Sequence, residues 1–148
     1  MFLAGLLCLL LAGEAGAACT VSATGVNFGP YDVFVTIPLD STGTVTVACD
    51  QSPPVDVTIA IGPSGTSGGF IPRQMRSASS QDRLNYNLFV NAGRSTVWGD
   101  GAAGTSTVFL KNVVKNRPVL TTIYGRIPPR QDVSVGTYTD SLTVTITP

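Results

Sequence analysis

The sequence contains no histidine in its 148 residues, and its only glutamate is Glu14. Histidine is the commonest general base and zinc ligand, so its absence argues against a catalytic triad and against the usual zinc sites in this chain. Nine acidic residues less Glu14 leave eight aspartates, which are scattered without the short spacing of a carboxylate pair or a calcium loop. We therefore expect no enzyme, no metal site and no cofactor.

Charge is also scarce, at 12% of residues, and the formal net charge is zero. A neutral chain lacks the basic excess that attracts nucleic acids or anionic membranes. The composition therefore predicts no nucleic-acid partner.

The N-terminal 17 residues resemble a cleavable export signal. Residues 2–12 are an unbroken apolar and small-residue run, too short for a membrane span. Residues 15–17 (Ala-Gly-Ala) form a small-x-small cleavage pattern, which makes Ala18 the expected first mature residue. No Lys or Arg precedes the run, which indicates a start site placed too late or a missing front piece. The remaining residues, 18–148, are about the size of one domain.

The cysteine content agrees with export. Cys8 would be lost with the signal, and Cys19 and Cys49 would remain as a pair in an oxidising compartment. A disulfide between them would close a loop of about 30 residues and contribute at most roughly 3–4 kcal/mol. The alternative is a lipoprotein acylated at Cys19, although the preceding residues 16–18 lack the usual leucine.

Short runs of alternating apolar and polar residues, separated by Gly, Pro and Ser, predict strands rather than helices. No segment shows a sustained helical period. The fold class that we predict is an all-β antiparallel sandwich of immunoglobulin-like type, with a closed barrel as the alternative. The expected strands cover residues 20–28 with an interruption at Gly25, 42–49, 55–61, 84–90, 105–110, 119–127 and 136–148.

The last expected strand places Leu142, Val144 and Ile146 on one face and threonines on the other. No later strand follows to cover its edge. An exposed apolar edge is normally an aggregation hazard, but it is useful to a protein that takes the missing strand from another chain.

Two loops contain candidate binding residues. Trp98 is either a sugar-stacking platform or a core residue, and Asp100 is either a site residue or part of a turn. Phe70 and Ile71, which follow a glycine-rich loop, are exposed apolar residues or ordinary core residues. The nearby arginines 73 and 76 are interpreted as solvated charges at a strand end.

Several segments in order resemble the spore coat protein U domain family, which includes subunits of archaic chaperone–usher pili of Gram-negative bacteria. The resemblance covers nearly all of the mature chain. The segments are Cys19-Thr-Val-Ser-Ala-Thr-Gly-Val-Asn-Phe-Gly29, Thr42-Gly-Thr-Val-Thr-Val-Ala-Cys49, Leu84-Asn-Tyr-Asn-Leu-Phe89, Thr96-Val-Trp-Gly-Asp-Gly101, Tyr124-Gly-Arg-Ile-Pro128 and Gly136-Thr-Tyr-Thr-Asp-Ser-Leu-Thr-Val-Thr-Ile146.

The resemblance implies an incomplete immunoglobulin-like sandwich that lacks its final strand. A periplasmic chaperone would supply the strand first, and the N-terminal extension of a neighbouring pilus subunit would replace it at the outer-membrane usher. The protein would pass through the periplasm to the cell surface. The acceptor groove would be lined by Val21, Val26, Phe28, Leu142, Val144 and Ile146, and the Cys19–Cys49 bridge would hold the first two strands in register.

The expected cleavage next to Cys19 leaves Ala18 alone before the first cysteine, so no donor segment remains. A subunit that accepts a strand without donating one sits at the fibre tip, which favours an adhesin. The alternatives are a self-contained secreted domain that binds carbohydrate or another surface, and a structural protein of a cell coat or matrix.

Overall fold

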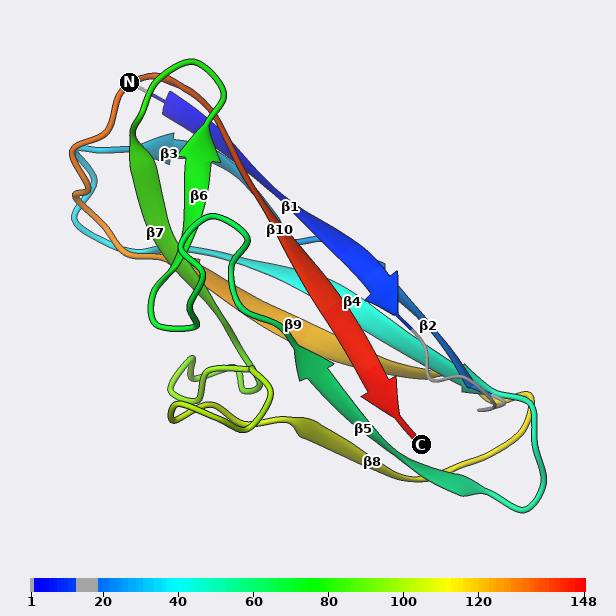
Figure 1. The fold of residues 1–148 in the computed structure, drawn as a ribbon. Helices are drawn as coiled ribbons and strands as arrows, with labels where there is room; N and C mark the ends of the chain where they lie inside the picture. The colour runs from blue at the N-terminus through cyan, green and yellow to red at the C-terminus, as the bar shows by residue number, and fades with distance from the viewer. Residues whose placement is uncertain (1, 13–18) are drawn as a thin grey trace.

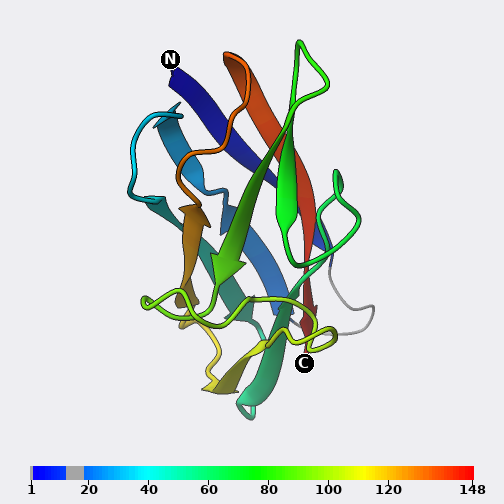
Figure 2. The same cartoon turned by 90° about the vertical axis from the view of Figure 1, so that its left-hand side faces the viewer.

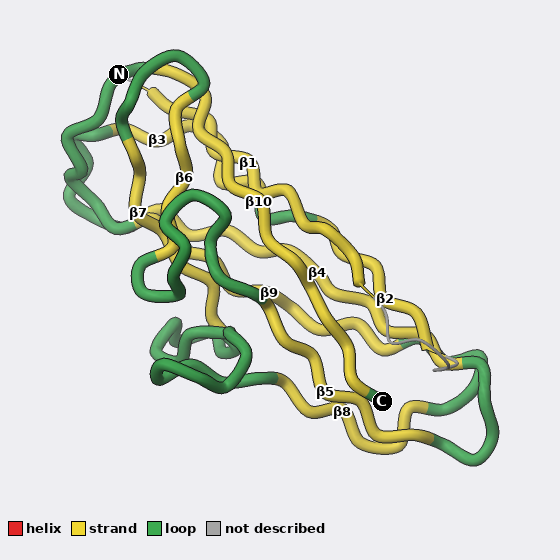
Figure 3. The backbone as a smooth tube through the Cα atoms, in the orientation of Figure 1, coloured by secondary structure: helices red, strands yellow, loops and turns green. Residues whose placement is uncertain are grey.

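The computed structural model describes residues 2–12 and 19–148, and every regular element in this part of the chain is a β-strand. Figure 3 shows these strands and the loops between them. No helix long and apolar enough to span a membrane occurs in the described ranges. The strands are β1 (Phe2–Ala12), β2 (Cys19–Thr24), β3 (Asn27–Asp32), β4 (Leu39–Cys49), β5 (Val55–Ile61), β6 (Arg73–Ser77), β7 (Arg83–Phe89), β8 (Val108–Val113), β9 (Val119–Ile127) and β10 (Gly136–Thr147).

The strands form an immunoglobulin-like sandwich of two layers (Figures 1 and 2). One layer has the order β2-β4-β9-β7, and the other has the order β3-β1-β10-β5-β8. The short strand β6 pairs with both β10 and β7 and so connects the layers. All of these pairs are antiparallel except β1 with β10, which is parallel. The all-β class predicted from the sequence is confirmed.

The interior is built by the alternating residues that the sequence pattern identified. Along β4, Val45, Val47 and Cys49 are buried, and along β10 every second residue from Tyr138 to Ile146 is buried. Both runs face a single apolar core between the layers. Period-two alternation therefore places one face of each strand in the core and leaves the other face near water.

Three segments differ from the sequence-based expectation. Residues 27–32 form a separate strand, β3, whereas the first expected strand ended at residue 28; Pro30 is tolerated there because β3 is an edge strand. Residues 73–77 form β6, which the sequence pattern did not identify as a strand. The strand expected at 105–110 lies at Val108–Val113, where it pairs with β5 through an irregular register.

Residues 2–12, expected as the core of an export signal, form β1 in the described structure. The expected cleavage pattern at residues 15–17 lies outside the described residues. Cleavage before Ala18 therefore stays a prediction.

Candidate strand-acceptor groove

Strand β1 lies between β10 and β3 and pairs with both (Figure 1), and the two strand edges that it covers are the candidate acceptor groove. From Leu3 to Ala12, every residue of β1 is paired in parallel with a residue of β10 from Gly136 to Thr145. On its other side β1 is antiparallel to β3, from Phe2 opposite Asp32 to Leu6 opposite Asn27. The strand that completes this sheet therefore comes from the opposite end of the chain.

The two edges of β10 are satisfied in different ways. On one edge, Val144–Thr147 pair with β5 and Tyr138–Thr139 pair with β6. Between these pairs, the amides of Gly62 and Gly65 donate to the carbonyls of Thr143 and Ser141 at 2.8 and 3.1 Å. This edge is thus paired by the domain itself. The other edge is paired along 136–145 by β1 alone among the described strands.

The six residues predicted to line the acceptor groove all belong to the apolar core cluster, but they differ in the strands that they belong to and in their position relative to β1. That cluster contains Val21, Val26, Phe28, Leu142, Val144 and Ile146. Leu142 and Val144 are paired with Leu9 and Leu11, whereas Ile146 lies beyond the β1 register and is paired with Ile59 of β5.

The three early residues of the set lie at different places. Phe28 lies in β3, next to the groove, and Val21 lies in β2, whose hydrogen-bonded partner is β4; Val26 lies in the short connection between β2 and β3. Gly125 of β9 lets Phe28 pack closely, because a Cβ there would lie 2.8 Å from the Phe28 ring. The ring of Phe28 also meets Tyr86 edge-on, with centroids 6.2 Å apart. These contacts tie the β3 wall of the groove to the opposite sheet.

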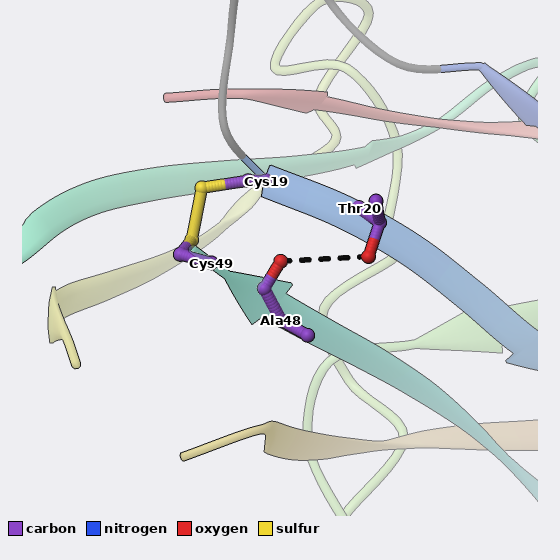
Figure 4. The surroundings of a disulfide bond; sticks show 4 residues. All are labelled: Cys19, Thr20, Ala48 and Cys49. Carbon is purple, nitrogen blue, oxygen red and sulfur yellow. Dashed lines mark hydrogen bonds between the residues drawn. A yellow bond between two sulfur atoms is a disulfide. The ribbon is translucent and has the colours of Figure 1, made fainter. Parts of the chain in front are cut away.

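The disulfide expected from the cysteine count is confirmed. Cys19 and Cys49 are paired residues at the ends of β2 and β4, with their sulfur atoms 2.08 Å apart (Figure 4). The adjacent Thr20 hydroxyl lies 3.5 Å from the carbonyl oxygen of Ala48, to which it donates a hydrogen bond (Figure 4). The bridge joins the first strand of the β2-β4-β9-β7 layer to its neighbour.

The four candidate loop residues do not form one exposed patch. Trp98 is fully buried, and its indole N–H donates to the carbonyl oxygen of Ile59 at 3.1 Å, so its ring is not available for stacking on a ligand. Asp100 is exposed and accepts the Ala102 amide at 2.9 Å, as in a turn. Phe70 is half-buried, and only Ile71 is an exposed apolar residue.

Arg73, interpreted from the sequence as a solvated charge, is completely buried. Its guanidinium donates to the carbonyls of Ile61, Gly62 and Trp98 and to Oδ1 of Asn87, at 2.7–3.3 Å. Burial lowers the pKa of this group to about 10, so it stays charged at neutral pH. The sequence-based interpretation was wrong because these acceptors come from three separate segments that only the fold brings together.

A second buried polar group, the carboxylate of Asp140, belongs to β10. Asp140 of β10 accepts hydrogen bonds from the hydroxyls of Tyr86 and Ser64 and from the Thr66 amide, at 2.5, 2.7 and 3.1 Å. Burial, together with the neighbouring carboxylate, raises the pKa of the Tyr86 hydroxyl far above its usual value, so it remains a donor. Asp140 therefore anchors the 62–72 loop to the strand that forms the groove.

An apolar surface that the sequence analysis missed lies in the loop after β3. Phe34 and Ile37 are 74% and 68% exposed. Ile37 also lines a cleft of about 140 Å³, together with Pro30, Tyr31, Asp32, Val35, Pro38 and Leu39. The only sequence signal was the run Val33-Phe-Val35 between two prolines.

The described residues contain no group of three or more His, Cys, Asp or Glu side chains placed to hold a metal ion. The buried face of β10 is apolar apart from Asp140, whose oxygens already have donors. The arrangement is suited to binding a strand, through main-chain hydrogen bonds and apolar contacts.

The fold and the groove define the class of protein. It is an immunoglobulin-like sandwich in which one edge of the last strand, β10, is paired only with the N-terminal segment β1 among the described strands. The chain belongs to the Spore Coat Protein U domain family, whose model matches residues 7–145.

Two individual proteins show the range of similarity. Protein U of Myxococcus xanthus is 35% identical over 144 residues, which cover 89% of this chain and 78% of that protein. Among solved structures, the minor tip subunit HdaB of the E. coli Hda pilus gives a TM-score of 0.40 at 17% identity, covering 85% of this chain and 78% of that one.

Proposed function

We propose that this protein is a structural or adhesive subunit of a chaperone–usher surface pilus, assembled by donor-strand complementation. Membership of the Spore Coat Protein U domain family supports the proposal, because the sequence resembles pilus subunits in that family. The partners would be a periplasmic chaperone, an outer-membrane usher and neighbouring subunits. The role would be non-catalytic.

The observation that carries the proposal is that residues 19–148 supply no strand to pair with one edge of β10. Within residues 19–148, no strand pairs with Gly136–Thr145 on the side that β1 covers. Leu142 and Val144 on this strand are buried core residues. An edge of this length with an apolar face is unfavourable in water, and it is a template for pairing with another strand.

A donor strand from another chain would complete the sheet in the place of β1. Its backbone would bond to β10 on one side and to β3 on the other, and its alternate side chains would enter the apolar core. The chaperone would supply this strand in the periplasm, and a neighbouring subunit would supply it in the fibre. Cleavage before Ala18 would remove residues 1–17, and a chain that accepts a strand without donating one would lie at the fibre tip.

A structural protein of a cell coat is the second candidate, and the description of the family as a spore coat domain favours it. Strand exchange between copies would also build a coat, but without a chaperone and usher. A free-standing sugar-binding domain built on Trp98 has less support, because the Trp98 ring is buried.

The test is thermal unfolding of residues 18–148 in the oxidised form, with and without a synthetic donor peptide. The peptide is as long as β1 and alternates Val and Thr between terminal lysines, so its pattern reads the same in both directions. The control peptide has the same composition without alternation. A weak transition that rises by tens of degrees with the alternating peptide alone supports the proposal. A cooperative transition at high temperature that neither peptide moves would mean that the domain is complete without a donor.

The pilus and the coat are separated by a second measurement. Co-production with a chaperone of the pilus type should raise the yield of soluble 18–148 domain if the protein is a pilus subunit. A coat protein should instead form polymers from the purified chain without any chaperone.

A further inference from the structure

A polar cleft of about 150 Å³ lies where the 62–72 loop meets β6 and β10. We propose that this cleft, with Arg83 beside it, binds the carboxylates and hydroxyls of an acidic polysaccharide. The inference goes beyond the proposed function, because it depends neither on strand exchange nor on residues 1–17. The residues that line the cleft are Gly65, Thr66, Arg76, Thr139, Asp140 and Ser141.

Two exposed arginines oppose each other at this place. Arg76 of β6 and Arg83 of β7 are directly paired in the antiparallel register. Like charges in this arrangement are unfavourable. The ion pairs within the described part of the chain involve Arg94, Lys115 and Arg126, so neither of the two arginines has an acidic partner there. A local arrangement that costs stability without compensation is expected at a functional site, here one for an anion.

Both arginines lie at the cleft. Arg76 lines it and is paired with Thr139 across β6 and β10. The guanidinium of Arg83 lies 3.4 Å from the carbonyl oxygen of Thr66, which also lines the cleft. A guanidinium presents paired N–H donors that match the two oxygens of a carboxylate. The site therefore offers two cationic groups to carboxylates of a ligand.

The two carboxylates in this region are already engaged by the domain. Asp140 lines the cleft but is 3% exposed, and its oxygens accept three hydrogen bonds from within the domain. Its negative charge also favours the charged form of the buried Arg73. Asp82, next to Arg83 in sequence, accepts the Ser134 amide at 2.7 Å. The solvent-facing charge at the cleft is therefore that of the two arginines.

The main-chain groups of the cleft do not suit a compact anion such as phosphate. Phosphate sites typically present free backbone N–H groups. Here the Gly65 amide donates to the carbonyl oxygen of Ser141 at 3.1 Å, and the Thr66 amide donates to Asp140 at 3.1 Å. Both amides are thus taken up by the fold.

The side chains instead suit a sugar. The cleft is lined by the hydroxyl residues Thr66, Thr139 and Ser141, and a hydroxyl can both donate and accept. Beside the arginines, the amides of Gln74 and Asn85 are hydrogen-bonded to each other at 2.8 Å across β6 and β7. This polar surface crosses β10, β6 and β7, a width of about 10 Å, which suits a chain of sugars better than a single unit.

The first experiment measures binding of uronic acid oligomers to the full chain, 1–148, by isothermal titration calorimetry. The probes are oligomers of galacturonic, glucuronic and mannuronic acid, each compared with its methyl ester, which is uncharged. We expect at least one acid to bind, and its ester to bind at least roughly tenfold more weakly. Equal binding of acid and ester, or no binding of any acid, would overturn the inference. So would displacement of the bound oligomer by inorganic phosphate at an equal concentration.

The second experiment repeats the titration with Arg76→Gln and Arg83→Gln. The matched control is Arg117→Gln, which removes the same charge from an exposed position in the loop between β8 and β9, at the other end of the sandwich (Figure 1). We expect each of the first two changes to weaken binding by at least roughly tenfold, and the control to leave it unchanged. Unchanged binding in the first two variants, or an equal loss in the control, would overturn the inference.

Thermal unfolding of the same variants separates binding from folding. Because Arg76→Gln and Arg83→Gln each remove one of two opposed like charges, both should melt at or above the temperature of the unmodified chain. A clear fall in both melting temperatures would mean that the arginines serve the fold, and would overturn the inference. Each of these failures would leave the proposed strand exchange intact, because that proposal does not involve the arginines.

Discussion

The hydroxyl of Tyr86 donates a hydrogen bond of 2.5 Å to Oδ2 of Asp140, and so joins β7 to β10 across the interior of the sandwich. The remaining donors to this carboxylate are the Ser64 hydroxyl and the Thr66 amide. A buried carboxylate that loses a donor bears an unfavourable desolvation free energy. The contact therefore links the stability of the domain to the strand that forms the acceptor groove.

Replacing Tyr86 by Phe should lower the free energy of unfolding by about 1–3 kcal/mol, because one oxygen of Asp140 loses a strong donor. The matched control is Tyr138→Phe. That ring is equally buried, but its hydroxyl donates to the loop carbonyl of Ser134 at 2.8 Å, in a partly exposed position. Urea unfolding of both variants gives the comparison. Equal losses of unfolding free energy in the two variants would show that the Tyr86–Asp140 hydrogen bond stabilises the domain no more than the Tyr138–Ser134 hydrogen bond does.

Replacing Arg73 by Met should be among the most damaging single changes, with a loss of about 3–5 kcal/mol. It removes the donor to three backbone carbonyls and to Asn87 together. Arg76, three residues further along β6, is exposed, so Arg76→Met should change stability by less than about 0.5 kcal/mol. Chemical denaturation measures both variants. A small effect at Arg73 would mean that water replaces the lost donor.

Trp98 is the only tryptophan of the chain, so its fluorescence reports one site. Because the indole is fully buried and bonded to Ile59, we expect blue-shifted emission in the folded protein and little quenching by iodide. Unfolding in guanidinium should shift the emission to the red and restore quenching. Strong quenching in the folded state would restore Trp98 as a candidate surface residue.

Asp40 should make a small, pH-dependent contribution to stability. Arg126 donates to its two oxygens at 2.7 and 3.0 Å, and this hydrogen bonding lowers the pKa of Asp40 below its usual value. A lower pKa in the folded state means that the contribution is present above the unfolded pKa, about 3.9, and is lost as the pH falls through the folded pKa.

The pair is partly exposed, so Asp40→Asn should cost at most about 1 kcal/mol at pH 7 and nothing measurable near pH 2. Urea titrations at both pH values check this. Asp50→Asn is the control, because its pair with Lys115 is longer, at 3.6 Å, and more exposed. A loss for Asp40→Asn that persists at low pH would assign the effect to packing instead of charge.

Local patterns predicted much of this fold. The alternation at Val45, Val47 and Cys49 and again at Leu142, Val144 and Ile146 identified strands and their buried faces, because side chains of a strand alternate by geometry alone. The even count of cysteines expected after removal of the signal, together with the resemblance to the family, identified the Cys19–Cys49 bridge.

Other features depended on neighbours that are distant in sequence. Arg73 is indistinguishable from a surface arginine until its carbonyl acceptors from Ile61, Gly62 and Trp98 come together. The role of Asp140 likewise depends on Tyr86, 54 residues earlier.

The sequence by itself determined the class of secondary structure, the buried faces of the strands and the disulfide, because these follow from local alternation and from cysteine number. Only the tertiary structure decided that β1 lies between β10 and β3 and runs parallel to β10. Apolar residues occupy both odd and even positions of β1, so its pattern specifies neither a face nor a direction. Direction and partner are set by the edges that the rest of the sandwich leaves unpaired.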